Sequence, residues 1–427
     1  MSSRLKGSPR SGLVAGTVAF FGGYAAVALY SITVNRLAPL LHLSIIQVGL
    51  LVAIPISTGA LLRIPFSAWV ETYGGRRILF IQLLIAAVGM LGIILSIYSF
   101  LNGFLRNAGS VYYLLLIFGA LAGTGVSTFS SGITYVSYWY PKSKQGTALG
   151  AFAGFGNAAP GIFTAILPYA LISLGLIGSY VSWLVFLLIV IAVFLLIGYD
   201  SYYYQFLRHG MPRENAIEEA KKRGQELFPS CSALQSLKVA AKEWSTWFLV
   251  IMYFTSFGGF EALTSWFPTY WTHYLKVSLV LAGLLTGVMY SLITALIRVP
   301  GGVLSDRWGG ENTAIASYAV MIAGGLFIIF SRSFSVSLIG EILLAIGMGI
   351  ANAAVFKLVP KYSSKAVGGE SGWVGGLGSV GGLVLPPVLA AFVSSFGTAG
   401  YSAGFTVFVV LALVSIALSL VLRRKKA

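Results

Sequence analysis

The length of its apolar runs is the feature that most constrains the fold of this 427-residue chain. Twelve runs have about 20 residues each, the length at which a helix crosses the hydrocarbon core of a bilayer. They cover approximately residues 13–34, 46–70, 78–99, 112–136, 147–171, 180–199, 246–270, 279–302, 313–331, 335–357, 369–393 and 400–422. Only 9% of the residues are charged, which is too few to cover a soluble protein. The sequence therefore predicts an all-α membrane protein with twelve transmembrane helices.

The two halves of the chain repeat one pattern at a constant offset of 235 positions. The matched pairs are Arg63 with Arg298, Pro65 with Pro300, Glu71 with Asp306, Gly74 with Gly309 and Gly75 with Gly310. A charged, helix-prone stretch separates six runs from six. We therefore expect an N-terminal six-helix bundle at 1–199, a cytoplasmic linker at 200–244 and a C-terminal six-helix bundle at 245–427. Transporters with such parallel repeats bind substrate between the bundles, near the middle of the membrane.

The distribution of the basic residues predicts the orientation of the chain. The formal net charge is +16. Lysines and arginines gather at the N-terminus, in alternate loops, in the central stretch and in the tail, whereas the other loops hold only Arg36, Arg106, Lys276 and Arg332. Because basic loops stay on the cytoplasmic side, both termini are predicted to be cytoplasmic, in a protein of the cell membrane. The charge is thus explained by topology and contact with the lipid bilayer, without a nucleic-acid partner.

Arg63 and Arg298 are single cations inside otherwise apolar runs. Each lies eight residues before the acid of its repeat, about 12 Å along a helix and near the centre of the membrane. A charge at that depth is costly, so such residues usually face a cavity on a substrate path. The pair predicts a pocket for a small anion between the bundles. The alternative is that each arginine pairs with an internal acid such as Glu261.

Two loops of matching sequence join neighbouring runs. AWVETYGGRR at 68–77 and GVLSDRWGG at 302–310 each place an acid and a Gly-Gly turn beside basic residues. An acid at a helix end beside cationic side chains can form an ionic latch that a conformational change breaks. The predicted latch residues are Glu71, Arg76, Asp306 and Arg307.

Two further runs are rich in glycine. The segment at 141–161 contains Gly150, Gly154 and Gly156 on or near one helix face, followed by Asn157, and the segment at 372–387 contains Gly375, Gly378 and Pro386–Pro387. Small residues let a neighbouring helix approach closely, and the prolines are expected to break or kink the second helix. We interpret both as helices that bend during alternating access. Helix packing alone is the alternative interpretation, with Asn157 joining helices rather than binding a ligand.

The loop motifs resemble the signature of the major facilitator superfamily. TALGAFAGFGN, the glycine spacing from Gly372 to Pro386, both arginine-containing segments and NAAVFKLVPKY at 352–362 resemble the nitrate/nitrite porter family within it. The resemblance implies that Arg63 and Arg298 bind a planar anion. It implies further contacts from Asn157, Phe129, Tyr253 and Phe257. Guanidinium groups suit planar oxyanions, and flanking rings would exclude water.

Glu261 departs from the pattern of that family, since an anion exchanger needs no carboxylate inside the membrane. It follows Phe257 by one helical turn. We consider it a possible site of proton coupling. A salt bridge or an outward-facing position is the alternative.

The resulting hypothesis is a monomeric transporter of nitrate, nitrite or both, acting by alternating access as a proton symporter or as a nitrate/nitrite exchanger. A porter of formate, oxalate or another monocarboxylate is the alternative within the superfamily, because carboxylates are also planar. A non-transporting anion sensor is a more distant alternative. The sequence has no metal-ligand spacing, phosphate loop or nucleophile–base arrangement, and its single cysteine is Cys231. We therefore expect neither an enzyme nor a cofactor.

Overall fold

The computed structural model describes residues 5–229 and 232–424, and every regular element in these ranges is a helix. Cys231 lies outside the described residues. The first part of the chain contains α1 (Pro9–Tyr24), α2 (Val34–Leu41), α3 (Ile45–Tyr73), α4 (Gly75–Leu101), α5 (Ala108–Gly123), α6 (Thr128–Ser137), α7 (Gln145–Gly156) and α8 (Ala159–Ile197). Short 3-10 turns lie at η1 (Ala25–Ala28), η2 (Thr124–Ser127) and η3 (Lys142–Lys144).

Three short helices follow, namely α9 (Tyr202–Arg208), α10 (Arg213–Lys221) and α11 (Ala233–Lys242). The last part contains α12 (Trp244–Tyr253), η4 (Phe254–Gly258), α13 (Gly259–Thr269), η5 (Tyr270–Tyr274), α14 (Leu279–Leu284), η6 (Leu285–Leu292), α15 (Ile293–Leu296), α16 (Arg298–Trp308), α17 (Gly310–Phe330), α18 (Phe334–Tyr362), α19 (Val367–Ser379), α20 (Gly381–Phe396), η7 (Gly397–Ala399), α21 (Gly400–Ala403) and α22 (Thr406–Arg424).

Within the described residues, 11 helical segments are long and apolar enough to cross a membrane. One of them, Lys142–Ile197, has 56 residues. At 1.5 Å per residue it is more than twice as long as a bilayer core of about 30 Å is thick. It also contains a break at Gly175, whose φ of 67° and ψ of −176° are not helical. This segment therefore holds two of the predicted spans, and the structure agrees with a twelve-span chain.

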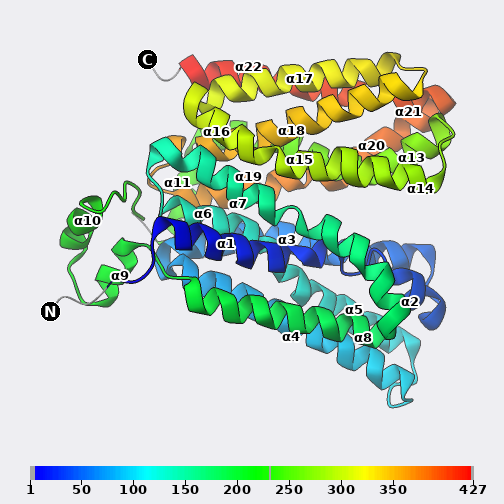
Figure 1. Ribbon diagram of the computed structural model, residues 1–427, viewed down its shortest axis with the longest axis horizontal. Helices are drawn as coiled ribbons and strands as arrows, with labels where there is room; N and C mark the ends of the chain where they lie inside the picture. The colour runs from blue at the N-terminus through cyan, green and yellow to red at the C-terminus, as the bar shows by residue number, and fades with distance from the viewer. Residues whose placement is uncertain (1–4, 230–231, 425–427) are drawn as a thin grey trace.

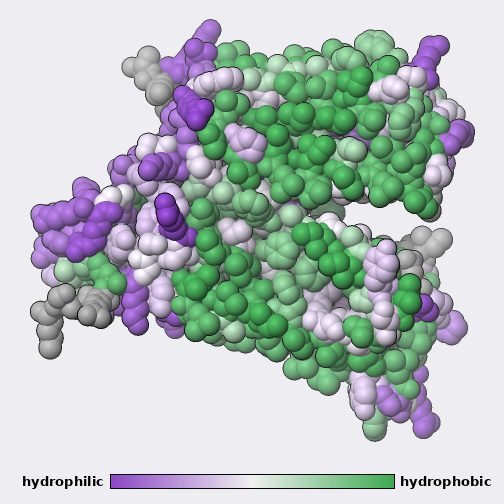
Figure 2. Space-filling model, in the orientation of Figure 1, coloured by the Kyte–Doolittle hydropathy of each residue, from purple (hydrophilic) through white to green (hydrophobic). Residues whose placement is uncertain are grey.

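The spans form two groups that lie side by side (Figure 1). Helices α1 to α8 make one group, and α12 to α22 make the other. The short helices α9 to α11 lie at one end of the molecule, which we call the linker end; the opposite end is the far end. Apolar residues cover the flanks of both groups, while hydrophilic residues gather at the two ends (Figure 2). Figure 2 also shows a gap between the groups at the far end and contact between them toward the linker end.

Several spans are irregular at the level of the backbone, among them Val280–Trp308, which contains the π-helical turn η6. The span Trp244–Tyr274 contains π-helical turns at η4 and η5, a geometry that is frequent at functional sites. The glycine-rich span Val367–Ala403 is interrupted at Val380, between α19 and α20. Of the expected break or kink at Pro386–Pro387, the break is wrong, because both prolines lie inside α20, and the kink stays a prediction. The interruption lies six residues before Pro386, between Gly378 and Gly381, and glycines allow the backbone more conformations than other residues do.

Candidate functional site

Arg63 and Arg298 are both 1% exposed and come from opposite groups of helices. Arg63 lies in the middle of α3, and Arg298 is the first residue of α16. The carbon of each guanidinium lies over the ring of Phe257, at 5.4 Å from the centroid for Arg63 and 5.1 Å for Arg298. The structure therefore brings the two repeat-related cations to one aromatic ring. Their shared ring places them between the two groups.

Three parallel aromatic rings form one wall of this region. Phe129 of α6 is stacked with Phe257 at 6.0 Å and an interplanar angle of 2°, and with Tyr253 at 6.2 Å and 6°. Tyr253 and Phe257 are themselves stacked at 4.9 Å. Arg63 also lies over Phe129, at 5.2 Å. The rings named from the family resemblance thus lie together, and a π-helical turn begins directly after Tyr253.

The polar atoms of this region are poorly paired. Nη1 of Arg63 donates to the carbonyl of Gly375 at 2.9 Å, but its Nε is buried without a partner. Nε and Nη2 of Arg298 are also buried without hydrogen bonds. The Tyr253 hydroxyl interacts electrostatically with Arg298 but makes no hydrogen bond of ordinary geometry. Buried cationic donors without partners are costly, so this arrangement favours binding of an anion.

Asn157 lies at the end of α7 and is 6% exposed. Its Nδ2 donates to the carbonyl of Ala153 in its own helix at 2.7 Å. Its Oδ1 is buried and has no partner. In this conformation the amide N–H therefore serves the helix end. The amide nitrogen carries a second N–H, which remains able to donate to an oxyanion.

Sequence reasoning missed two residues of α18 that belong to the same region. The ring of Phe356 is perpendicular to those of Phe129 and Tyr253, with centroids 5.0 Å and 4.7 Å away. Asn352 lies one turn earlier, is 2% exposed, and neither atom of its amide has a partner. The available signal was an asparagine inside an apolar run, four residues before a phenylalanine on the same helix face.

Glu261 of α13 accepts a hydrogen bond from the Tyr24 hydroxyl of α1 at 3.3 Å. The contact connects the two groups of helices. Arg63 and Arg298 both attract the carboxylate electrostatically, yet neither lies within 4.0 Å as an ion pair of the described structure. Glu261 therefore interacts with both arginines through longer-range electrostatic attraction and forms a direct ion pair with neither.

Glycines line two seams between the groups. A Cβ at Gly150 would lie 2.6 Å from the carbonyl oxygen of Arg298, and one at Gly154 would lie 2.8 Å from Val299, so α7 packs closely on α16. The related seam joins α19 to α3. There the glycines in contact are Gly368, Gly372 and Gly376, which face Ser67, Ile64 and Ala60. Their spacing of four residues makes one stripe along α19.

The other glycines named from the sequence have different neighbours. A Cβ at Gly156 would collide with Phe20 of α1, because a step of two residues turns away from the Gly150–Gly154 face. Gly375 lies against Ser130 of α6, and Gly378 lies against Tyr253 within its own group. The expectation that Gly150, Gly154 and Gly156 share a helix face is therefore wrong for Gly156.

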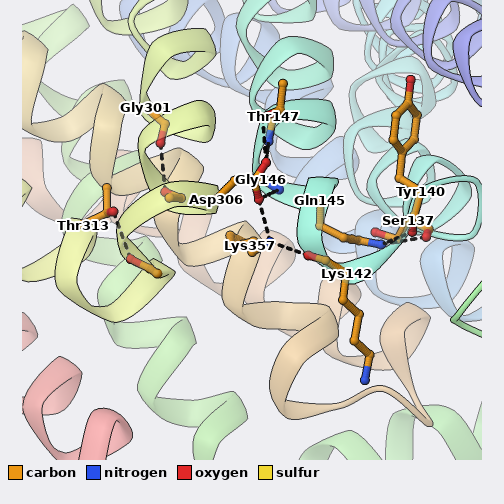
Figure 3. A network of polar contacts seen from close by, with 12 residues as sticks. Ser137, Tyr140, Lys142, Gln145, Gly146, Thr147, Gly301, Asp306, Thr313 and Lys357 are labelled. Atoms are coloured by element: carbon orange, nitrogen blue, oxygen red, sulfur yellow. Dashed lines mark hydrogen bonds and ion pairs between the residues drawn. The ribbon is translucent and has the colours of Figure 1, made fainter.

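Each acid of the repeated loop motif reaches a helix N-terminus in the opposite group. Asp306 of α16 accepts hydrogen bonds from the backbone N–H of Gly146 at 2.8 Å and of Thr147 at 2.6 Å, at the start of α7 (Figure 3). It also pairs with Lys357 of α18 at 2.6 Å. Glu71 of α3 accepts from the backbone N–H of Gly368, at the start of α19. A carboxylate is stabilised at such a site by unpaired N–H groups and the helix dipole.

The basic residues of the predicted latch lie elsewhere. The backbone N–H of Arg76 donates to Asp200 at 2.8 Å, and its guanidinium donates to the carbonyl of Leu195. Arg307 is exposed at the end of α16. The contacts across the groups are therefore made by the acids on helix ends, while Arg76 joins its own group to the start of the linker.

A family model described as the Major Facilitator Superfamily matches residues 13–289 and 249–427. The "Nitrite extrusion protein" of Bacillus subtilis is 28% identical over 94% of this chain and 91% of that protein. The "Probable nitrate transporter" of Staphylococcus epidermidis is 26% identical over 93% of both chains. A "Probable nitrate/nitrite antiporter" of Thermus thermophilus is 28% identical over 88% of this chain and 83% of that protein.

Solved structures support the same architecture. The proton:xylose symporter XylE is 15% identical and superposes with a TM-score of 0.70 over 97% of this chain and 95% of that chain. The transporter FucP in its outward conformation is 16% identical, with a TM-score of 0.71 over 95% of this chain and 97% of that chain. At this identity the match concerns the fold. Together with the family model that spans the described helices, it leads to one conclusion: this multi-pass membrane protein belongs to the Major Facilitator Superfamily.

Proposed function

We propose that the protein transports nitrate, nitrite or both across the cell membrane by alternating access. The observation that carries this proposal is the pair of buried arginines over Phe257, with donors left unpaired between the two groups of helices. The relatives described as nitrate and nitrite transporters cover most of the chain and support the same substrates. The anion site consists of Arg63, Arg298, Asn157, Phe129, Tyr253 and Phe257.

The chemistry of these side chains suits a small planar monovalent anion. Guanidinium N–H groups can donate in a plane to two oxygens of nitrate or nitrite. The parallel rings of Phe129, Tyr253 and Phe257 form one flat wall, which suits a planar anion. Two arginines and one ionised Glu261 leave a net charge of +1, which matches one nitrate.

We place the linker end in the cytoplasm, in keeping with the basic loops and tail. The gap at the far end then faces outward, and the two groups meet on the cytoplasmic side (Figure 2). Segments 1–199 and 245–427 move as two bundles joined by 200–244, with one chain forming the whole path. Inward opening separates the α7–α16 and α3–α19 seams. It also removes Asp306 and Glu71 from the helix ends that they cap.

Protonation of Glu261 is the step that would couple nitrate entry to protons. A neutral Glu261 leaves both arginine charges unopposed and so strengthens anion binding. The hydrogen bond from Tyr24 to Glu261 joins the two bundles. A change in the charge of Glu261 would therefore also change a contact between the bundles. An exchanger has no use for this step and would keep Glu261 as a fixed counter-charge.

Proteoliposomes with an internal nitrate sensor test the proposal. Uptake driven by an inward proton gradient alone indicates symport, and uptake that requires internal nitrite indicates exchange. Glu261→Gln is expected to abolish the dependence on the proton gradient in a symporter while nitrate still binds. Unchanged proton flux in Glu261→Gln would contradict coupling through this residue. Absence of uptake in both arms, with folded protein, would contradict nitrate transport itself.

Competition separates the remaining substrates. Chlorate resembles nitrate in charge and size, whereas formate is a planar carboxylate. We expect chlorate to reduce nitrate uptake at concentrations where formate does not. The reverse order would favour a monocarboxylate porter, and binding of nitrate without flux would favour a sensor.

A further inference from the structure

A groove at the linker end lies outside the anion site. It has a volume of about 430 Å³ and is lined by Thr72, Tyr73, Arg76, Arg77, Phe80, Leu195 and Arg208. These residues come from the end of α3, the first turns of α4, the end of α8 and the short helix α9. The groove therefore lies where α3 and α8 of the first bundle end, α4 begins and the linker starts.

The groove is strongly basic. Three of the residues that line it are arginines. The carboxylate of Asp200, which is 1% exposed, pairs with Arg208 and accepts the backbone N–H of Arg76. Arg208 itself remains 49% exposed, so part of its guanidinium is open to a ligand. Arg76 uses one nitrogen on the Leu195 carbonyl and lies over the Tyr199 ring at 5.1 Å. Arg77 lies over the ring of Tyr73 at 5.9 Å. The arrangement holds the guanidiniums in place and leaves donors for an oxyanion.

Apolar surface continues from the groove toward the middle of the membrane. Leu195 and Phe80 form its apolar lining, and α4 packs along α8. Farther along the same two helices, Leu84 is 45% exposed and Leu188 is 49% exposed. Figure 2 shows hydrophobic residues over this flank of the molecule. A ligand in the groove would thus meet cations at one end and an acyl-chain surface at the other.

We propose that this groove binds the phosphate headgroup of an anionic phospholipid, with its acyl chains along the α4–α8 flank. Basic pockets at the cytoplasmic ends of spans recognise such headgroups. The continuous apolar flank favours a lipid over free phosphate, which would leave that surface unused. Bound lipid would tie α3, α4, α8 and the linker together. This contact is independent of the anion carried between the bundles.

The test is native mass spectrometry of the full-length protein in detergent, titrated separately with phosphatidylglycerol and phosphatidylcholine. We expect preferential retention of phosphatidylglycerol. Arg77→Gln should weaken this binding about fivefold, since each basic residue near the membrane surface contributes about that factor. Arg77→Lys, which keeps the charge, should change it less than twofold. Lys242→Gln is the matched control, because Lys242 is also exposed at the linker end but lies outside the groove.

Three results would overturn the proposal. The first is equal binding of the two lipids. The second is an unchanged affinity for phosphatidylglycerol in Arg77→Gln with an unaltered melting temperature. The third is binding of inorganic phosphate at the groove that displaces the lipid, since the site would then serve a free anion. Nitrate binding measured on the same samples separates this outcome from a failure of the proposed transport function.

Discussion

Arg63 and Arg298 occupy equivalent positions of the repeat but have unequal surroundings. Arg63 lies over two rings, Phe129 and Phe257, and donates to the carbonyl of Gly375. Arg298 lies over Phe257 alone, and two of its nitrogens are buried without partners. Arg63 donates a hydrogen bond to the opposite bundle, whereas Arg298 has more unpaired N–H donors that a ligand could use. The repeat therefore predicts the same depth for both cations, whereas their different contacts predict different roles.

The seams beside the two arginines are alike in tightness. A Cβ at Gly150 would lie 2.6 Å from the carbonyl oxygen of Arg298, and one at Gly372 would lie 2.8 Å from the carbonyl oxygen of Ile64. The difference between the two sides therefore concerns the arginines themselves. It predicts that Arg298 controls anion affinity more strongly than Arg63.

The largest effect is expected for Arg298→Lys. Lysine is a point charge and cannot donate in a plane to two oxygens, so we expect nitrate to bind about 100-fold more weakly. Isothermal titration of purified protein measures the change. Arg332→Lys is the control, because Arg332 is exposed in a loop. Affinity within threefold of the wild type in Arg298→Lys would remove this residue from the anion site.

The next effect concerns closure of the seam at Gly150. Gly150→Ala places a methyl group against the backbone of α16, which can move little. The state closed at the linker end should be destabilised by about 2 kcal/mol relative to the open state. Uptake should fall roughly 30-fold. Nitrate affinity should change much less than uptake. Gly161→Ala is the control, since nothing lies within 4 Å of a Cβ there. Equal rates of nitrate uptake by Gly150→Ala and Gly161→Ala would show that transport does not require close packing at Gly150.

Arg63→Lys should have a smaller effect on affinity, about tenfold, because an ammonium group can still donate to the Gly375 carbonyl. The comparison with Arg298→Lys is made in the same titration. If Arg63→Lys weakens binding more than Arg298→Lys does, the proposed division of roles between the arginines is wrong.

Asp306→Asn should have the smallest effect. It removes the charge at the start of α7 and the ion pair with Lys357. The equilibrium between the states closed and open at the linker end should shift about fivefold toward the open state. Accessibility of a cysteine introduced in the α7–α16 seam reports the shift. Asp200→Asn is a comparison variant, since Asp200 caps the start of α4 within one bundle. A similar shift in both variants would argue against a specific role for the seam.

Much of the architecture followed from the order of the residues. The long apolar runs, the repeat offset and the loop motifs predicted the membrane fold and the superfamily, and the family model confirms both. The break within α8 at Gly175 was foreseen as a gap between two runs. The hydrogen bonds from Gly146 and Thr147 to Asp306 were not foreseen. The sequence had predicted a latch between side chains, whereas the donors here are backbone N–H groups.

The sequence by itself predicted that Arg63 and Arg298 lie equally deep in a membrane, since the length and polarity of a run decide how a helix crosses a bilayer. It also determined that aromatic and glycine-rich segments surround them. Only the tertiary structure decided which residues meet across the bundles. It selected the stripe Gly368, Gly372 and Gly376, added Asn352 and Phe356, and turned Gly156 toward Phe20. The physical reason is that such contacts depend on the rotation and separation of packed helices, which hydrophobic length leaves open.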